Sequence, residues 1–501
     1  MDKMIKVIVN GNSVLVGSGT LLSDALHMEK PCGGHGRCGK CKVIARGELS
    51  PLSEAEKKWF SEQELADGGR LACMTKVLGD CEVFLDTDSE KSRIVSDGYL
   101  PAFTLKPTFS KYGVAIDIGT TTLAARMFDA QGRMLSETSC LNPQAEFGAD
   151  VVSRIEAALA GENEVQADTI RKALDRLLLV LAESAKIDAK EIDGIVITGN
   201  TVMLSLLTEE DVTPLSRAPF VLKRHFGEWL TAKELRLSHV DEGVRIYLPP
   251  CISAFVGADI TCAILSARLC EKEAAMLVDI GTNGEMALWQ KGRLTVCSTA
   301  AGPAFEGVGI SMGMRAAEGA IDRVELCNGQ LMAHVIGDGN PKGICGSGLI
   351  DAVAAMLMRG DLDESGYMDE ENTVIAAPVS VSAEDIRKLQ LAKSAICAGM
   401  LTLMEEETVD ASALEVLYVA GGFGHFLNFK NAAKIGFLPS GLITKATAVG
   451  NAALAGATLL LLSADERQKA EDIAGNATHL SLAANPTFSN YYMEGMIFEE
   501  I

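Results

Sequence analysis

Four cysteines near the N-terminus have the residue type and spacing to hold a metal cluster. Cys32, Cys38 and Cys41 lie in a glycine-rich run with the spacing C-x5-C-x2-C, and Cys73 follows later. This spacing is close to the C-x4-C-x2-C…C arrangement that binds [2Fe–2S] clusters, with one residue added. Glycines suit such a loop because they permit unusual backbone angles and let N–H groups approach sulfur. The run therefore predicts a [2Fe–2S] cluster held by these four thiolates.

The same cysteines could instead bind zinc or remain without a metal. A structural zinc site usually pairs two C-x2-C knuckles, whereas this chain has one such pair and an isolated fourth cysteine. Unliganded thiols in the core are a further alternative. Cys81 is a rival fourth ligand, but Asp80–Leu85 alternates like a strand, where a small apolar residue needs no metal. His35 is a rival ligand that a solvent-facing position explains more simply.

A second chemistry is indicated by a motif that occurs twice. Asp117-Ile-Gly-Thr and Asp279-Ile-Gly-Thr each end an apolar run, and the second copy follows the first by 162 residues. The glycines let backbone amides approach phosphate oxygens, and the neighbouring side chains can donate to them. The predicted phosphate-binding residues are Gly119, Thr120, Thr121, Thr122, Gly281, Thr282 and Asn283.

The two aspartates of these motifs are expected to face each other across a cleft. There they can hold Mg²⁺, largely through water, because magnesium loses its waters reluctantly. A single Asp117 or Asp279 could simply cap a turn, but two copies in register predict a nucleotide site. No residue stands out as a general base. Asp150 and Glu285 lie near the loops, but a solvated helix face and a strand edge explain them more simply.

Each copy of the motif lies within the same predicted series of strands. The first series is a strand over 113–118, a strand over 123–128, a turn at 129–132 and a strand over 133–138. The second is a strand over 275–280, a strand over 285–289, a turn at 291–292 and a strand over 293–297. Such an internal repeat is hard to obtain by chance.

Three further glycine motifs extend the predicted nucleotide site. The strand at 415–420 stops at Gly421 and Gly422, where a base and ribose could lie on bare backbone. Gly346 and Ser347 open an apolar helix, an arrangement that suits anion binding at a helix N-terminus. The strand and Gly/Asn turn at 194–203 is expected to connect to a helix, and direct ligand contact there is left open.

Composition limits the other classes of function. The chain has 501 residues, which predicts two to four domains, and a formal charge of −22, which argues against nucleic acid binding. No signal peptide precedes the first predicted strand, and the apolar stretch 452–462 is too short to span a bilayer. Thirteen cysteines in such a chain indicate reduced thiols and cluster ligands. We therefore expect a cytoplasmic protein that does not bind membranes.

The N-terminal elements agree with the cluster prediction. A strand over 4–9, a turn at Asn10-Gly11, a strand over 13–16 and a helix over 20–26 precede the cysteine loop. This order resembles the β-grasp of plant-type ferredoxins. The composition of a linker then follows, with Pro101 and Pro107. The predicted domains are 1–86, a linker at 87–111, and 112–501, divided into halves at 112–271 and 272–501.

The paired loops and the Gly-Gly motif together resemble the acetate and sugar kinase, Hsp70 and actin superfamily. That resemblance implies two RNase H-like α/β halves that clasp ATP, so the expected fold is an α+β multidomain chain: a β-grasp ferredoxin-like domain, a short linker and a duplicated ATPase domain. With the N-terminal cluster domain, the whole chain resembles the reductive activators of corrinoid-dependent enzymes. Segments 147–155, 302–311 and 449–456 also resemble that family.

The resemblance implies an activity. Family members reduce an oxidised Co(II) corrinoid protein to the Co(I) state that a methyltransferase system requires, with electrons from an upstream low-potential donor. A plant-type cluster has a reduction potential of about −400 mV, whereas Co(I) formation generally needs a lower potential. ATP is therefore expected to drive the electron transfer from the cluster to cobalt. Two rival functions stay open. One is electron donation to a non-corrinoid acceptor such as a radical dehydratase, and the other is redox sensing gated by a nucleotide.

Two departures from the family are expected. Longer members carry a middle domain between linker and ATPase, which this chain is expected to lack because Gly113 follows the linker almost at once. The second departure is from corrinoid activators that carry a C-terminal cysteine-rich cluster module. No cysteine follows Cys397 here, so a single cluster is predicted. The identity of the corrinoid protein is not determined by the sequence, and a homodimer is left open.

Overall fold

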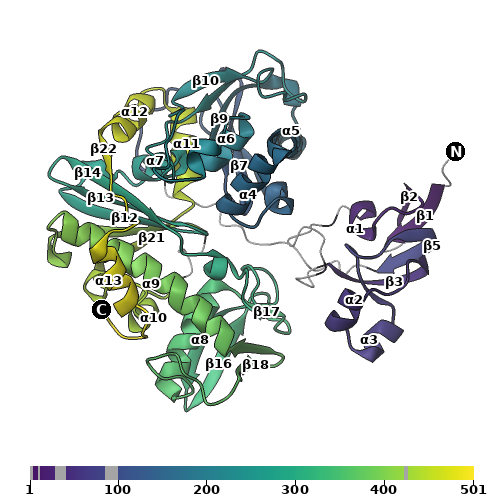
Figure 1. Ribbon diagram of the computed structural model, residues 1–501. Coiled ribbons are helices and arrows are strands. Elements are labelled where there is room, and N and C mark those ends of the chain that lie inside the picture. The colour runs from purple at the N-terminus through teal and green to yellow at the C-terminus, as the bar shows by residue number, and fades with distance from the viewer. Residues whose placement is uncertain are drawn as a thin grey trace.

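The structure is a computed structural model that describes residues 4–9, 12–26, 28, 36, 41–84, 100–422 and 427–501. It shows a small N-terminal domain and two larger lobes (Figure 1). Within the described ranges, no helix is long and apolar enough to cross a membrane.

The N-terminal domain is a five-stranded sheet with the order β2-β1-β5-β3-β4, in which β1 and β5 run parallel. Strand β5 alternates strictly, and Val77, Cys81 and Val83 point into the core. The predicted β-grasp arrangement agrees with this topology. Its elements are β1 (Met4–Val9), β2 (Asn12–Gly17), α1 (Leu22–Ala25), β3 (Lys42–Leu49), α2 (Glu54–Trp59), α3 (Glu62–Ala66), β4 (Gly69–Leu71) and β5 (Val77–Phe84).

The first lobe is built on a six-stranded sheet with the order β10-β11-β9-β6-β7-β8. Strands β6, β7 and β8 form an antiparallel meander, and β9 pairs parallel to β6. Its strands are β6 (Tyr112–Ile118), β7 (Thr122–Asp129), β8 (Met134–Leu141), β9 (Ile192–Gly199), β10 (Glu228–Thr231) and β11 (Arg245–Leu248). Its helices include α4 (Val151–Ala157), α5 (Asn163–Ala185), α6 (Thr201–Leu207) and α7 (Ala258–Ser266).

The second lobe repeats this plan with the order β21-β20-β12-β13-β14-β22. Asp117 pairs with Ala124 on the antiparallel side, as Asp279 pairs with Glu285. The predicted duplication is therefore confirmed in strand order and direction, but the pairing is offset by one residue because the second hairpin loop is one residue shorter. The strands are β12 (Ala274–Ile280), β13 (Gly284–Gln290), β14 (Arg293–Thr299), β20 (Val416–Ala420), β21 (Ala446–Gly450) and β22 (Ala477–His479).

The second lobe carries further elements around its sheet. Three strands form a small second sheet, and two more form a hairpin. These elements are β15 (Ala320–Cys327), β16 (Gln330–Val335), β17 (Gly343–Ile344), β18 (Asn372–Ala376) and β19 (Val379–Ser382). The helices are α8 (Gly346–Arg359), α9 (Ala383–Glu406), α10 (Phe429–Lys434), α11 (Ala452–Leu462), α12 (Glu466–Asn476) and α13 (Pro486–Glu494).

A pair of helices joins the two lobes. Helix α11 returns from the second lobe to lie beside α7 of the first (Figure 1). Gly456 permits this close approach, because a Cβ there would lie 2.1 Å from the Cys262 carbonyl oxygen. All eleven residues of α11 are buried, which explains why this apolar stretch belongs to the core.

The chain between the small domain and the lobes is described from residue 100 onward. Lys106 and Thr108 donate their backbone N–H groups to carbonyls at the end of α11, at 2.9 and 3.0 Å. The buried Phe109 ring lies over Gly113, and its Cβ lies against Gly194, so a Cβ on either glycine would clash with Phe109. The last part of the segment proposed as a linker therefore packs against the ATPase lobes.

Candidate functional site

One cavity of about 250 Å³ lies between the two lobes. It gathers residues from all five glycine-containing motifs that the sequence singled out. All thirteen residues predicted to contact the nucleotide or Mg²⁺ line this cavity: Asp117, Gly119, Thr120, Thr121, Thr122, Asp279, Gly281, Thr282, Asn283, Gly346, Ser347, Gly421 and Gly422. Residues far apart in sequence thus converge on one site.

The first loop, between β6 and β7, is fixed by its own lobe. The Asn142 side chain donates to the Gly119 carbonyl at 2.9 Å, and Asn200 donates to the Thr120 hydroxyl at 3.0 Å. Arg154 has no exposed surface and donates to the Thr120 carbonyl at 2.6 Å. A buried guanidinium therefore lies directly behind the loop, where its positive charge favours a bound anion.

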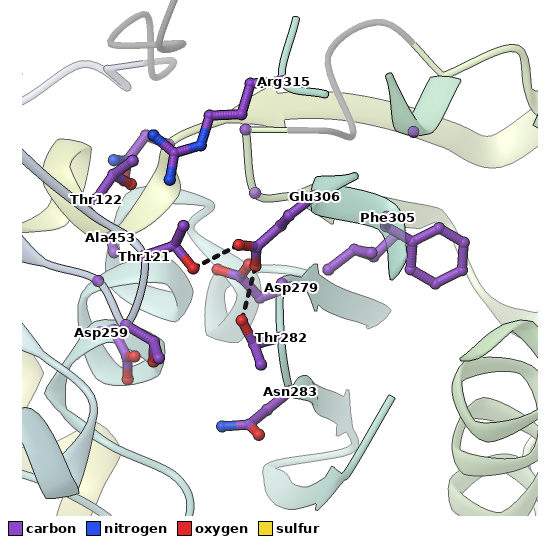
Figure 2. Close-up of a pocket in the computed structure, with 18 of the residues that line it drawn as sticks. Thr121, Thr122, Asp259, Asp279, Thr282, Asn283, Phe305, Glu306, Arg315 and Ala453 are labelled. Carbon is purple, nitrogen blue, oxygen red and sulfur yellow. Dashed lines mark hydrogen bonds between the residues drawn. The ribbon is translucent and has the colours of Figure 1, made fainter. Parts of the chain in front are cut away.

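The second loop, between β12 and β13, is bonded to an acid that also contacts the first loop. The Glu306 carboxylate accepts from the Thr282 hydroxyl at 2.9 Å and from the Thr121 hydroxyl of the first loop at 2.5 Å (Figure 2). One side chain of the second lobe therefore bridges both phosphate loops.

Four further carboxyl groups line the cavity and are largely surrounded by protein atoms. Burial raises the pKa of Asp117 to about 6, against the opposing hydrogen bond from Asn451 at 3.0 Å. Burial, then the charges of Asp117 and Glu306, raise the pKa of Asp279 to about 7. Burial and the neighbouring aspartates raise the pKa of Asp259 to about 8.

The fourth carboxyl group is Glu285, whose pKa is raised well above its ordinary value by burial and then by Asp259 and Asp279. Its side chain is buried and lines the cavity, so its description as a strand-edge carboxylate is incomplete. Such crowded acids are unfavourable unless a cation joins them. In the described part of the chain, no three Cys, His, Asp or Glu side chains converge as a ready-made metal site.

The glycines leave open space where a ligand could lie. A Cβ on Gly422 would meet no atom within 4 Å, and one on Gly281 would meet its nearest neighbours only at 3.7 Å. Gly421, with φ +95°, has the opposite role, because a Cβ there would lie 2.5 Å from the Ile280 carbonyl oxygen. The Gly-Gly pair thus contains one residue required by packing and one that faces the cavity.

The N-terminus of α8 forms another wall of the cavity. Ser347 donates to the Asp322 carbonyl at 2.9 Å, which fixes the first turn against β15. Gly348 allows the same close packing, since a Cβ there would lie 2.2 Å from the Ile321 carbonyl oxygen. The N–H groups at the N-terminus of this fourteen-residue helix are suited to an anion.

Several lining residues were not predicted from sequence. Asp259 follows Gly257 at the start of α7, and Asn451 follows Gly450 at the start of α11, so a glycine before a helix was the available signal. Arg315 supplies a guanidinium to the described lining, and its side chain extends toward the cavity in Figure 2. Asp150, by contrast, caps α4 by accepting from Ser153 N–H at 2.8 Å, and it is not among the lining residues.

Two of the predicted cluster ligands lie next to each other. The Cys41 and Cys73 sulfurs are 3.2 Å apart, and both side chains are buried. Cys81 lies in the core on β5 instead. Cys32, Cys38 and His35 lie outside the described residues. The chemistry of the described pair fits a cluster bound by thiolates.

A buried acid holds the loop that carries Cys73. Glu56 has no exposed surface and accepts from the Arg70 guanidinium at 2.8 Å, from Leu71 N–H at 3.2 Å and from the Thr75 hydroxyl at 2.9 Å. These three donors lie on both sides of Cys73, so Glu56 fixes the position of its thiol. Trp59 on the same helix donates to the Gly36 carbonyl at 2.9 Å.

Comparison with known proteins matches the N-terminal domain and both lobes to family models. Three family models match successive segments: a 2Fe-2S iron-sulfur cluster binding domain at residues 7–78, the RACo middle region at 112–272, and the C-terminal domain of RACo, the ASKHA domain, at 273–501.

Two relatives match across most of their length. The corrinoid activation enzyme RamQ of Eubacterium limosum is 34% identical over 418 residues, which cover 77% of this chain and 70% of RamQ. The [Co(II) methylated amine-specific corrinoid protein] reductase of Methanosarcina barkeri is 27% identical over 415 residues, 76% of each chain.

A solved structure agrees with these relatives. The reductive activator for corrinoid,iron-sulfur protein superimposes with a TM-score of 0.73 and 28% identity, covering 99% of this chain and 98% of that one. The likeness thus extends over the domains of both chains.

These matches correct one expectation. The sequence predicted that a middle domain is missing, but the family's middle region matches residues 112–272. The prediction failed because that region is itself the first RNase H-like lobe, with the sheet that carries the first phosphate loop. The chain therefore belongs to the family of reductive activators of corrinoid proteins, in which a [2Fe–2S] domain precedes an ASKHA-type ATPase domain.

Proposed function

We propose that this protein uses MgATP to drive the transfer of an electron from its [2Fe–2S] cluster to a corrinoid protein in the Co(II) state, which restores Co(I) for methyl transfer. The convergence of thirteen predicted nucleotide contacts on one cavity, in a chain that also carries a [2Fe–2S] domain, supports this most strongly. The partner is inferred from the relatives, which are activators or reductases of corrinoid proteins.

The cluster would be held by Cys32, Cys38, Cys41 and Cys73, and when bound it supplies one electron at low potential. The close, buried sulfurs of Cys41 and Cys73 support this ligand set. Glu56 would keep the Cys73 loop in place between oxidation states, because its three hydrogen bonds do not depend on the metal.

In the cleft, the threonine hydroxyls and loop amides would bind phosphates, and Gly422 would accommodate adenosine. The open space over Gly422 supports this, because a side chain there would fill it, and a Cβ on Gly281 would likewise come no closer than 3.7 Å to any atom. Mg²⁺ is proposed between Asp117 and Asp279, whose mutual repulsion a divalent cation would relieve. Asp259 is the candidate base for the attacking water, because it lines the cavity near Asp117 and Asp279 and a cation bound there would lower its raised pKa and keep it ionised.

ATP would act through the corrinoid complex. A cluster with a reduction potential of about −400 mV is a weak donor for Co(I) formation. For one electron, each ~59 mV by which the cobalt potential lies below that of the cluster corresponds to about 1.4 kcal/mol. Nucleotide binding in the cleft can offset such a deficit by favouring the complex in which cobalt is more easily reduced. An upstream low-potential donor would then reduce the cluster again.

The test is anaerobic. Chemically reduced protein is mixed with a Co(II) corrinoid protein and MgATP, and the visible spectrum is followed for Co(I). Cys41→Ser should lose both the [2Fe–2S] absorption and Co(I) formation, while the matched control Cys81→Ser, altered in the core of β5, should keep both. ATP-dependent reduction of a radical dehydratase but no corrinoid protein, or nucleotide binding with no electron delivery, would instead support the rival functions.

A further inference from the structure

Glu306 is presented to the cleft by a short, anchored turn. It ends the 3-10 helix η6 (Pro303–Glu306), which lies between Gly302 at φ +79° and Gly307 at φ +74°. Phe305 beside it is buried, and its ring packs on Phe437 with centroids 4.7 Å apart. The backbone of the turn is therefore fixed to the second lobe while the carboxylate extends outward.

This carboxylate uses the donors that a phosphate would need. Both of its oxygens accept from threonine hydroxyls, one from Thr121 at 2.5 Å and the other from Thr282 at 2.9 Å (Figure 2). It also lies over the second loop, with one oxygen 3.7 Å from where a Cβ of Gly281 would be. The same space is the one proposed for phosphate oxygens.

The charges around Glu306 agree with an anion in this place. The guanidinium of Arg154 is buried behind the first loop, with Thr120 and Gly148 carbonyl oxygens as acceptors at 2.6 and 3.0 Å. Glu306 and Asp150 are the acids whose charges act on it. On the other side, Glu306 adds to the repulsion on Asp279. A phosphate and its Mg²⁺ would satisfy both environments better than a lone carboxylate.

We propose that Glu306 is an internal anion that occupies part of the polyphosphate subsite and ties the two lobes together, until an incoming phosphate displaces it. This inference rests on the proposed nucleotide binding. Thr121 belongs to the first lobe, whereas Thr282 and Glu306 belong to the second. Displacement therefore exchanges a direct bond between the lobes for bonds to a ligand, so that the cleft responds to phosphates and not to adenosine alone.

The test compares nucleotide affinities by calorimetry in the full chain. Removing the competing anion in Glu306→Ala should tighten MgATP binding about tenfold, while adenosine affinity stays unchanged, because hydrogen bonds to charged groups are worth enough for such a shift. Glu306→Gln, neutral but similar in shape, should fall between this variant and the wild type. Glu384→Ala, on the exposed start of α9, should match the wild type.

The outcomes separate the inference from the function on which it rests. Unchanged or weaker MgATP binding in Glu306→Ala, with normal binding in the wild type, overturns the inference and would assign Glu306 to holding the ligand. Absence of MgATP binding in the wild type overturns the proposed function itself. If Glu306→Ala does not fold, Glu306→Asp carries the same prediction, since its shorter side chain would not reach both hydroxyls.

Discussion

The two Asp-Ile-Gly-Thr loops share a sequence and a place in the same strand order, but their surroundings differ in charge and in attachment. The first loop is tied to its own lobe by Asn142, Asn200 and the buried Arg154. The second loop is next to acids, with Thr282 bonded to Glu306. The repeat thus preserves strand order, while the first lobe adds a buried guanidinium behind its loop. Both lobes supply acids to the cleft, Asp117 and Asp259 from the first and Asp279 and Glu285 from the second.

This difference suggests a division of labour. A rigid loop with a cation behind it is suited to fixing phosphates, and a crowd of acids is suited to recruiting Mg²⁺. Substitutions that alter one loop at a time, each compared with the other loop, should separate these two roles.

The largest effect is expected from the cation behind the first loop. Arg154→Met leaves the Thr120 and Gly148 carbonyls without their donor in a buried place, and should lower the free energy of unfolding by about 3 kcal/mol or more. Urea unfolding measures this. Arg293→Ala at the exposed hairpin turn of the second repeat, 62% exposed, should change it by less than about 0.5 kcal/mol. Equal losses of unfolding free energy in Arg154→Met and Arg293→Ala would contradict a special role for the cation behind the first loop.

The acids should make stability depend on pH. The pKa of Asp117 is raised from 3.8 to about 6 and that of Asp279 to about 7. The folded protein then binds more protons than the unfolded chain above pH 4, so stability falls as pH rises, by up to about 3 kcal/mol for Asp117 alone. The fall continues to about pH 8, because the pKa of Asp259 is raised to about 8.

Thermal unfolding at each pH checks this expectation. Each substitution should remove the part of the pH-dependent loss of stability that its aspartate causes. We expect Asp279→Asn to reduce the loss of stability up to about pH 7, and Asp117→Asn to reduce it only up to about pH 6, because these are the two raised pKa values. Added Mg²⁺ should stabilise the wild type above pH 7 and each variant less. A stability that rises with pH across this range, without Mg²⁺, would contradict mutual repulsion among the buried acids.

A smaller effect should distinguish the glycines of the two loops. A Cβ on Gly119 would lie 2.8 Å from the Thr122 carbonyl oxygen, so Gly119→Ala should destabilise the fold by about 1–3 kcal/mol. The nearest atoms to a Cβ on Gly281 lie at 3.7 Å, an ordinary van der Waals distance, so Gly281→Ala should leave stability within about 0.5 kcal/mol, yet weaken MgATP binding about tenfold. Loss of stability in Gly281→Ala with unchanged binding would reverse these roles.

The smallest effect concerns the attachment of the first loop. Asn200 caps α6 by accepting from Met203 N–H at 2.9 Å and also donates to Thr120. Asn200→Ala should therefore cost about 1 kcal/mol of stability. Asn200→Asp keeps the cap but loses the donor, so it should retain stability while MgATP affinity falls. Identical behaviour of the two variants would show that the contact with Thr120 is unimportant.

Much of this site could be predicted because its motifs are local. Strand β6 and the loop that follows it are encoded within about ten residues, and the glycines mark where backbone faces a ligand. Glu306, Arg154 and Asp259 could not be assigned in this way. Each is an ordinary charged residue in its own segment, and it acquires its role only when distant segments fold around the cleft.

The N-terminal domain shows the same limit. The cysteine spacing predicted the ligands, and Cys41 and Cys73 are indeed adjacent. The role of Glu56, which lies fifteen residues from the nearest of these cysteines in sequence, depends on three hydrogen bonds that only the folded sheet creates.

The most direct test of the central claim measures whether occupancy of the cleft drives electron delivery. Reduced wild-type protein and Gly422→Ala, in which a methyl group enters the open space beside the Gly-Gly motif, are each titrated with MgATP in the presence of a Co(II) corrinoid protein. We predict no Co(I) without MgATP, and a shift of the half-saturating MgATP concentration to higher values in Gly422→Ala. Equal amounts of Co(I) with and without MgATP would contradict ATP-driven electron delivery.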